Sequence, residues 1–532
     1  MRSPFSRAAT TGDGHRRRGS ALLFGATLVV FSFNIVFAGI GLRGTDQYWY
    51  AADLDMTKAT GRAVTNALYP TATLGAPAVS ADDLPTRIHN LPATYLAGAF
   101  FDVVGDDYTA WLILNTLLTF ATAAGIYVVV KRMGWAMPLL AASLFMAFPL
   151  TVWLSLNALA EMSLAFAMAL LLYGSALTVR GWSATGLYLA GASIVLLYYT
   201  RESFVLMAPA FVVFTVWLVK QRRVRLVAAG APLLLTLVLC ALKAQLLPAY
   251  PTSGLSSLLM SGTPSGGEQM GAYYSVDGVP FAFGEFAHKA WSGLLAAVIP
   301  GPVEFATELP VLVLMIVAFW KLRGDADSAV FRFWGAVTLG IYLLTAVVFQ
   351  AQNRYIFTLI PFACLFAVRL AARSPVRLGR RYRVPAFSLL VLAVVAFTFV
   401  SAFMAQQYRA DARRATAQTS ALASDLRAYP SGSVLRVDGG TELLQVTYAA
   451  APRAVLAISR KFNSEADTAR LIEAWDARVF LTSTADDVQF LRRATSLTAR
   501  RSWNLRPVES LATTGGPVAV WVASPRAIGS SQ

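Results

Sequence analysis

Four charged residues stand where a membrane protein could carry out chemistry at the surface of the bilayer. Asp46 follows the first long apolar run and begins the sequence Asp-Gln-Tyr-Trp-Tyr. Glu161 stands at the start of a later apolar run, and Arg201 and Arg354 lie at boundaries between further runs. Ionisable residues at membrane depth are energetically costly and usually mark functional sites. These four residues are therefore the first candidates.

Their types point to group transfer from a lipid-linked phosphate. A carboxylate can act as general base on the hydroxyl of an acceptor. A guanidinium can grip a phosphate through two parallel hydrogen bonds and stabilise the charge that develops as the phosphate leaves. We therefore predict Asp46 and Glu161 as catalytic residues, and Arg201 and Arg354 as ligands of the donor phosphate.

Structural roles compete with each of these assignments. Asp46 could belong to an aromatic belt at the interface, and Glu161 could cap a helix N-terminus. The two arginines could pair with lipid headgroups or with Glu202. No cofactor is required by the sequence; a divalent cation would find Asp46 and Glu161 as its ligands. Weaker candidates for substrate binding are Tyr48, Tyr50, Arg87, His89, Asn90 and Tyr355.

The composition predicts the elements that position these residues. Of the 532 residues, 56% are hydrophobic and only 14% are charged, against about 25% charged in soluble proteins. Long apolar runs recur between Ala21 and Met404, near the ~20 residues that cross a bilayer. We therefore expect a polytopic α-helical membrane protein with about eleven transmembrane helices. The predicted spans are 21–40, 108–130, 137–155, 158–179, 185–200, 204–219, 226–247, 309–320, 333–350, 355–372 and 385–404.

The basic residues predict the orientation. The net charge of +16 comes largely from short patches in alternate loops, on the same side as the basic segment 1–20. By the positive-inside rule that side is cytoplasmic, which also argues against a nucleic acid as partner. Outer loops 41–107 and 248–308 then face outward across the plasma (inner) membrane. Each contains an apolar stretch, 91–104 and 291–299, that could lie at the interface or re-enter the membrane.

The sequence pattern of the C-terminal segment predicts a separate domain. After the transmembrane part, 21–404, the segment 405–532 alternates short runs of strand character with helical patterns. Such alternation favours a small α/β domain, which would lie on the extracytoplasmic side.

At this point the chain resembles a known family. It is similar to the GT-C superfamily of polyprenyl-phosphate-sugar-dependent glycosyltransferases, which includes protein O-mannosyltransferases and the transferases that add aminoarabinose to lipid A. The resemblance covers most of 21–372. Its carriers, in chain order, are Asp46–Tyr50, Asn90–Leu96, Pro149 with Ala158–Glu161, the Thr200-Arg201 pair, and Asn353–Tyr355 with Pro361.

The resemblance implies roles for these residues. Asp46 matches the proposed catalytic base, Glu161 a second acid at the outer start of a later helix, and Arg201 and Arg354 the basic residues that hold the donor phosphate. The chain departs from many relatives in carrying Gln47 where they have a second adjacent acid. The implied activity is inverting transfer of a sugar to an extracytoplasmic glycan, lipid or protein, and the tail is similar to accessory domains that some relatives append.

Two other functions stay open. A lipid-linked glycan ligase or polymerase would concentrate arginines in one large later loop, whereas 248–308 is poor in Arg. A flippase or transporter of lipid-linked sugars would show internal repeats or broken helices near the midplane of the bilayer, and neither is evident in the sequence. The Ala- and Arg-rich composition indicates a high-GC bacterium.

Overall fold

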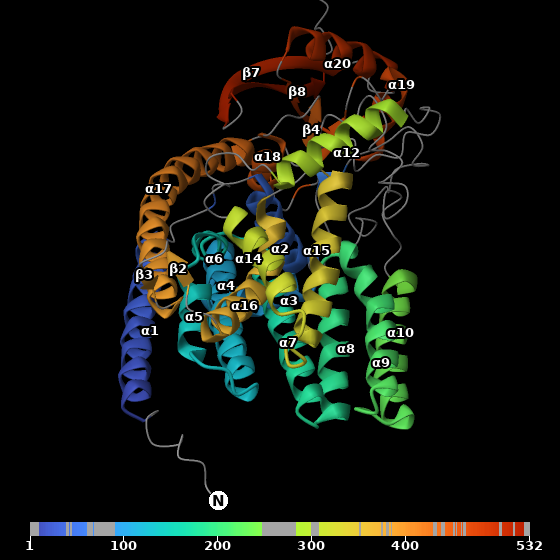
Figure 1. The fold of residues 1–532 in the computed structure, drawn as a ribbon. Coiled ribbons are helices and arrows are strands. Elements are labelled where there is room, and N and C mark those ends of the chain that lie inside the picture. The colour runs from blue at the N-terminus through green and yellow to red at the C-terminus, as the bar shows by residue number, and fades with distance from the viewer. Residues whose placement is uncertain are drawn as a thin grey trace, which may run out of the picture.

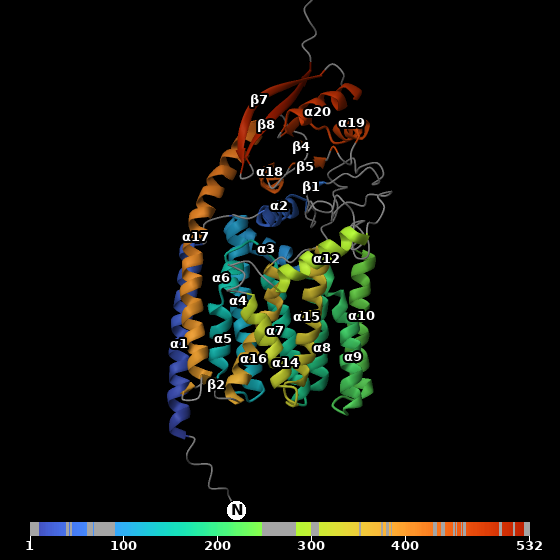
Figure 2. The same ribbon diagram turned by 45° about the horizontal axis from the view of Figure 1, so that its top comes forward.

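The described residues form a bundle of long helices that carries a β-sheet region at one end. Figures 1 and 2 show the sheet region at the opposite end of the bundle from the start of α1. We call the end that carries the sheet the sheet side. The computed structural model describes residues 10–38, 42, 45–60, 67–68, 91–246, 283–298, 308–349, 353–373, 376–378, 382–384, 386–428, 434–437, 442–450, 453, 455–458, 460, 464–482, 484–498, 503–513 and 516–525.

The bundle has the length and composition of a multi-pass membrane protein. Among the described residues nine helices are long and apolar enough to cross a bilayer, and a bent pair brings the number to ten. This confirms the predicted class. The nine are α1 (Thr10–Ala38), α4 (Asp107–Arg132), α7 (Glu161–Val179), α8 (Ser183–Thr200), η3 with α9 (Glu202–Leu206, Met207–Lys220), α10 (Leu226–Leu246), α15 (Ala329–Phe349), η6 with α16 (Asn353–Leu359, Ile360–Arg373) and α17 (Ala386–Ala428).

The predicted span 137–155 is broken in the middle. Helix α5 (Pro138–Ala147) ends before Pro149, which begins α6 (Pro149–Ser155), and the two helices meet at 63°. Phe148 between them is extended, with φ −62° and ψ 127°. This is the conformation expected of a residue before proline, because the proline ring clashes with a helical backbone at that position. The break leads the chain to the start of α7.

Four shorter helices complete the bundle. Helix α14 (Leu309–Lys321) has only 13 residues, fewer than the ~20 of a full span, although the sequence predicted a span there. Helices α3 (Leu91–Val104) and α12 (Phe283–Val298) cover the two stretches expected at the interface. In Figures 1 and 2, α12 lies across the sheet-side end of the bundle, close to the end of α15. Helix α2 (Thr45–Thr60) lies between the bundle and the sheet region.

Helices α7 and α8 pack closely because glycines face each other. A Cβ atom on Gly174 would lie 2.7 Å from the carbonyl oxygen of Gly186, and one on Gly186 would lie 2.5 Å from the carbonyl oxygen of Gly174. Small residues at such a contact let two helix backbones approach within a membrane. The two helices are joined by a tight turn at Gly181, whose φ of +92° favours glycine. Their other ends, at Glu161 and Thr200, therefore lie together.

Helix α17 connects the bundle to the sheet region. It runs without interruption over 43 residues, from Ala386 to Ala428, although the sequence predicted a boundary after Met404. A helix of this length spans roughly 65 Å, about twice the ~30 Å hydrocarbon core. The predicted boundary at 404 is thus a point within one continuous helix. A short hairpin of β2 (Val376–Leu378) and β3 (Tyr382–Val384) precedes it.

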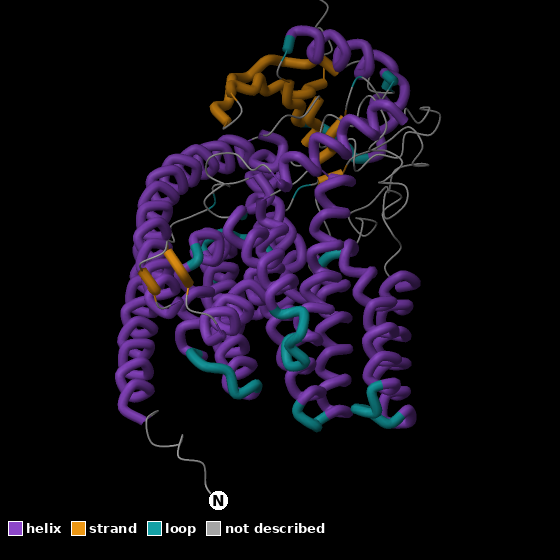
Figure 3. Tube along the Cα trace, in the orientation of Figure 1, coloured by secondary structure: helices purple, strands orange, loops and turns teal. Residues whose placement is uncertain are grey.

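The sheet region is a six-stranded mixed sheet covered on both faces (Figure 3). Leu422 and Leu426 of α17 pack with helix α18 on one face, and helices α19 and α20 cover the other. The strand order is β1-β5-β4-β6-β8-β7, and β1 comes from the first outer loop. The bounds are β1 (Ala67–Leu68), β4 (Val434–Val437), α18 (Glu442–Ala450), β5 (Val455–Ile458), α19 (Glu465–Ala474), β6 (Val479–Thr482), α20 (Ala485–Leu497), β7 (Trp503–Thr513) and β8 (Gly516–Pro525).

Candidate active site

Glu161 and Arg201 form an ion pair at the sheet side of the bundle. Glu161 is the first residue of α7, and Arg201 directly follows α8. Nη2 of Arg201 donates to Oε1 of Glu161 at 3.0 Å. The Glu161 side chain is 1% exposed and that of Arg201 16% exposed. The sequence predicted both residues, and the fold brings them into contact.

Tyr355 contacts the same guanidinium from a third element of the fold. It lies in η6, and its hydroxyl oxygen accepts a hydrogen bond of 3.0 Å from Nη1 of Arg201. Cζ of Arg201 lies 4.8 Å from the centre of the Tyr355 ring, within the range of a cation–π contact. A carboxylate and a phenol thus fix the position of Arg201. Tyr355 was predicted as a substrate-binding residue; in the structure it contacts the arginine.

Arg354 precedes Tyr355 in η6, so its backbone lies beside this cluster. Its side chain lies outside the described residues. The ends of α7 and α8 and the turn η6 therefore meet at one place. The backbones of Glu161, Arg201 and Arg354 lie together there, as the sequence predicted. The role of Arg354 stays a prediction.

Asp46 lies in the first turn of α2, and its side chain is outside the described residues. Its neighbour Gln47 is buried, and the Gln47 side-chain amide donates to Oδ1 of Asn157. The Tyr408 hydroxyl donates to Oε1 of Gln47 at 3.1 Å. Asn157 precedes Glu161 by four residues, and these bonds therefore fix the start of α2 beside the loop that enters α7.

A second amide holds this loop from α4. Nδ2 of Asn115 donates to the carbonyl oxygens of Asn157 and Leu159, at 2.6 and 3.0 Å. Asn115 is fully buried. The loop between α6 and α7 is therefore anchored by two amide side chains, one from α2 and one from α4. This arrangement places the backbone of Asp46 near the start of α7.

The remaining predicted substrate-binding residues have other surroundings. Tyr48 is buried and its hydroxyl lies 3.1 Å from Oγ1 of Thr419 in α17. Tyr50 is buried against Trp111 of α4 in an edge-to-face contact. Both side chains pack against neighbouring helices and hold α2 in place. The predicted residues Arg87, His89 and Asn90 lie outside the described residues.

The sequence reasoning missed Lys243. This residue stands near the sheet-side end of α10, and it is 2% exposed. Nζ donates to the carbonyl oxygen of Tyr198 at 2.6 Å and lies 4.4 Å from the centre of the Tyr198 ring. Tyr198 is three residues before Arg201, so Lys243 adds a second cation to this end of the bundle. A lone lysine at the outer end of an apolar span was the signal, because it departs from the positive-inside pattern.

A metal ion at this place would need ligands from Asp46 and Glu161. No three His, Cys, Asp or Glu side chains lie close enough together to hold one in the described part of the chain. Glu161, one of the two predicted ligands, is instead paired with the Arg201 cation. A divalent cation beside Asp46 and Glu161 stays a prediction, and we derive no chemical step through it.

The cluster is suited to holding an anion at the edge of the membrane. An arginine is always charged and presents a planar set of donors that matches the oxygens of a phosphate. Its orientation is set by Glu161 and Tyr355, so little freedom is lost when a ligand binds. Arg201 and Lys243 both lie at the sheet side, where the apolar helices end. A phosphate attached to a lipid tail would place its charge at this level.

The fold is shared with solved glycosyltransferases of the GT-C superfamily. No protein-family model matches the chain, and no curated protein matches it. ArnT from Cupriavidus metallidurans in the apo state is 13% identical with a TM-score of 0.59, over 97% of this chain and 100% of that one. The same protein bound to undecaprenyl phosphate is 13% identical with a TM-score of 0.58, over 94% and 97%.

A second solved protein has the same fold. The oligosaccharyltransferase AglB from Archaeoglobus fulgidus, in complex with an inhibitory peptide and a dolichol-phosphate, is 11% identical with a TM-score of 0.51. The match covers 95% of this chain and 75% of that one. At these identities the likeness establishes the fold. The GT-C fold expected from the sequence is therefore confirmed.

Proposed function

We propose that this chain, which has the GT-C fold, is an inverting glycosyltransferase that moves a sugar from a polyprenyl-phosphate donor to an extracytoplasmic acceptor. The observation that carries the proposal is the Arg201 guanidinium, held by Glu161 and Tyr355 where the bundle meets the sheet side. ArnT was solved with undecaprenyl phosphate and AglB with a dolichol-phosphate. A donor of the same lipid-phosphate chemistry suits an apolar bundle that ends at a fixed arginine.

The orientation follows from the basic residues. Arg180 and Lys131 lie at the end of the bundle opposite the sheet, where α4 and α7 end. In the proposed enzyme this end is cytoplasmic in the plasma (inner) membrane, and the sheet side is extracytoplasmic. The acceptor, a glycan, lipid or protein, then approaches from the side of the sheet region.

The proposed reaction is a single displacement. The acceptor hydroxyl oxygen forms a bond to the anomeric carbon as the bond from that carbon to the phosphate oxygen breaks, with inversion. The hydroxyl proton passes to Asp46, the general base. The electron pair of the broken bond stays on the phosphate, where Arg201 and Arg354 stabilise the added charge. Glu161 takes part in catalysis through Arg201, whose guanidinium it orients.

Two measurements on the purified chain test these roles separately. The first is binding of undecaprenyl phosphate, and the second is transfer from a panel of polyprenyl-phosphate sugars to acceptors in a membrane extract. In Asp46→Asn we expect transfer to fall by about 10²–10⁴, the usual contribution of a general base, with binding unchanged. In Arg201→Gln we expect binding to weaken by about 10–100-fold, the worth of hydrogen bonds to charged groups.

The matched control is Arg470→Gln, because Arg470 is an arginine on α19 that is 79% exposed and lies outside the cluster. It should leave both measurements at the wild-type level. Wild-type transfer by Asp46→Asn would remove the base assignment. Equal binding by Arg201→Gln and Arg470→Gln would place the donor phosphate elsewhere.

A further inference from the structure

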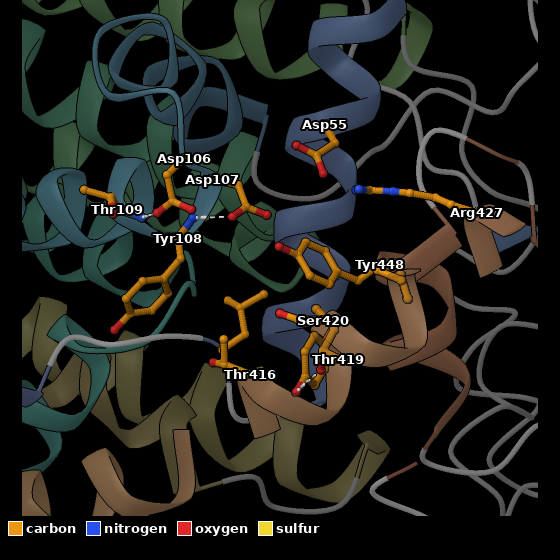
Figure 4. Close-up of a pocket in the computed structure, with 14 residues that line it drawn as sticks. Asp55, Asp106, Asp107, Tyr108, Thr109, Thr416, Thr419, Ser420, Arg427 and Tyr448 are labelled. Carbon is orange, nitrogen blue, oxygen red and sulfur yellow. Dashed lines mark hydrogen bonds between the residues drawn. The ribbon is translucent and has the colours of Figure 1, made fainter. Parts of the chain in front are cut away.

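An acidic cavity lies between the bundle and the sheet region. Its volume is about 420 Å³, within the usual range of about 300–1,000 Å³ for sites that hold a small ligand. Figure 4 shows side chains from α2, from the start of α4, from α17 and from α18 around it. The described lining residues are Leu42, Tyr48, Asp55, Asp106, Asp107, Tyr108, Thr109, Thr416, Thr419, Ser420, Ala423, Arg427, Tyr448 and Ala449.

The lining carries more negative than positive charge. Among its described residues Asp55, Asp106 and Asp107 are acidic and Arg427 is basic. Burial, together with the nearby Asp107 and Asp106 carboxylates, raises the pKa of Asp55 to about 7, and Arg427 opposes this rise only in part. The negative charge of the three acids is therefore only partly balanced by Arg427.

Asp107 presents a buried acceptor to this cavity. Its side chain is 5% exposed, and Oδ1 accepts from the backbone N–H of Tyr108 at 2.6 Å. Oδ2 is buried, and the Tyr448 hydroxyl donates to the Asp107 carboxylate. Figure 4 shows the Asp107 carboxylate directed toward the hydroxyl of Tyr448. A carboxylate has about four acceptor sites, so Asp107 can accept further hydrogen bonds from a ligand in the cavity.

The tyrosines add an aromatic wall. The rings of Tyr48 and Tyr448 lie 5.8 Å apart at an angle of 41°. Oγ1 of Thr419 donates to the Tyr48 hydroxyl at 3.1 Å and accepts from Nε2 of Gln445 at 2.8 Å, so this wall is held in place. An aromatic side chain offers an apolar face beside a polar tip. The wall therefore suits a ligand that has C–H faces as well as hydroxyl groups.

The chemistry of the lining selects one class of ligand. The Asp107 carboxylate and, above its pKa of about 7, the Asp55 carboxylate accept hydrogen bonds but donate none, so the ligand must carry donors. Their charge would repel a phosphate or a uronic acid. Among the described residues no three acids converge closely enough to share a metal ion. Donor hydroxyls spread over a ring, with apolar C–H faces between them, are the features of a saccharide.

We propose that this cavity binds a neutral saccharide, as a docking site for non-reacting sugar units of the acceptor. The link to the acceptor rests on the proposed function. This link is supported by the position of Tyr48 and Asp55 on α2, the helix whose first turn contains Asp46. A glycan held here would lie along the element that carries the general base.

Direct binding to the full-length protein in nanodiscs tests the site without transfer. The probes are neutral oligosaccharides of glucose, mannose, galactose and arabinose, with oligogalacturonate as the anionic comparison, followed by saturation-transfer difference NMR. We expect one neutral series to bind, oligogalacturonate not to bind, and Asp107→Asn to weaken the affinity at least tenfold. Asp411→Asn, an acid on α17 outside the lining, should bind as wild type.

Two phenylalanine substitutions on α17 distinguish a filled cavity from a folding defect. Ala423→Phe would fill the cavity from α17, whereas Ala421→Phe adds the same side chain at an exposed position of that helix. We expect loss of binding in the first variant only, with equal elution and thermal unfolding of both.

Three outcomes would overturn the proposal: no neutral series binding at millimolar concentration, equal binding by Ala423→Phe and Ala421→Phe, or oligogalacturonate binding as well as the neutral series. Asp46→Asn separates this site from the reaction, because it should keep full binding. Saccharide binding without any transfer by the wild type would refute the proposed function and leave the binding site standing.

Discussion

Nη2 of Arg201 lies 3.0 Å from Oε1 of Glu161, although forty residues separate the two in the sequence. They meet because α7 and α8 run antiparallel through the turn at Gly181 and bring their far ends together. Both side chains are largely buried at the end of the bundle. In such surroundings an ion pair is little screened by water, so each charge depends on the other.

Replacing the carboxylate tests this dependence. In Glu161→Gln the amide keeps the shape but loses the charge, and Arg201 is less firmly oriented. We expect about tenfold weaker binding of undecaprenyl phosphate, or about 1.4 kcal/mol, and a similar loss of transfer. Glu473→Gln, at an exposed position of α19, is the control. Tighter binding by Glu161→Gln would contradict a positioning role, because it would show that the carboxylate competes with the phosphate.

The hydroxyl of Tyr355 should contribute less than the carboxylate. Tyr355→Phe removes the acceptor that lies 3.0 Å from Nη1 of Arg201 but keeps the ring face 4.8 Å from Cζ. A single hydrogen bond contributes about 0.5–1.5 kcal/mol, so we expect binding of undecaprenyl phosphate to weaken by about 2–10-fold. Tyr355→Leu removes the ring face as well and should weaken binding further. If the two variants bind equally, the cation–π contact has no part in holding Arg201.

Gln47 should affect transfer without affecting donor binding. Gln47→Leu removes the hydrogen bonds to Asn157 and Tyr408 that fix the start of α2. Asp46 would then be less well placed, whereas Arg201 is untouched. We expect a fall in the rate of transfer of at least tenfold with the affinity for undecaprenyl phosphate unchanged. Tyr408→Phe removes one of the two bonds and should give a smaller fall; the reverse order would argue against this account.

The bundle and the Glu161–Arg201 pair could be anticipated because their signals are local. Apolar runs of span length, and charges at the ends of those runs, can be read without knowing which helices touch. The broken helix at Pro149 also has a local cause, but a break of 63° within one apolar run carries no hydropathy signal. The same is true of α17, whose polar second half continues the helix beyond the apolar half.

The acidic cavity could not be anticipated, because its residues become a group only in the fold. Asp55 and Asp107 are ordinary loop acids in the sequence, and Tyr448 lies more than three hundred residues away. The strand β1, which joins the first outer loop to the sheet beside β5, is another pairing that no local pattern encodes. Lys243 differs from these cases, because its unusual position at the outer end of a span was visible in the sequence.

The raised pKa of Asp55 predicts how stability depends on pH. Burial first, and then the Asp107 and Asp106 carboxylates, raise this pKa from 3.8 to about 7. Between about pH 4 and pH 7 the folded chain therefore holds a proton that the unfolded chain has lost. Since the folded state binds more protons, the Asp55 contribution to the free energy of unfolding falls as pH rises through this window and is constant above it.

Asp55→Asn removes this cost of ionisation. We expect the variant to exceed the wild type in stability at pH 8, by on the order of 1–3 kcal/mol, and the difference to shrink toward zero near pH 4. Thermal unfolding in detergent at pH 5, 6, 7 and 8 measures it, with Asp411→Asn as the control that should follow the wild type. An Asp55→Asn variant that is no more stable than the wild type at pH 8 would show that water or Arg427 already neutralises this carboxylate, and that the cavity is less acidic than its lining indicates.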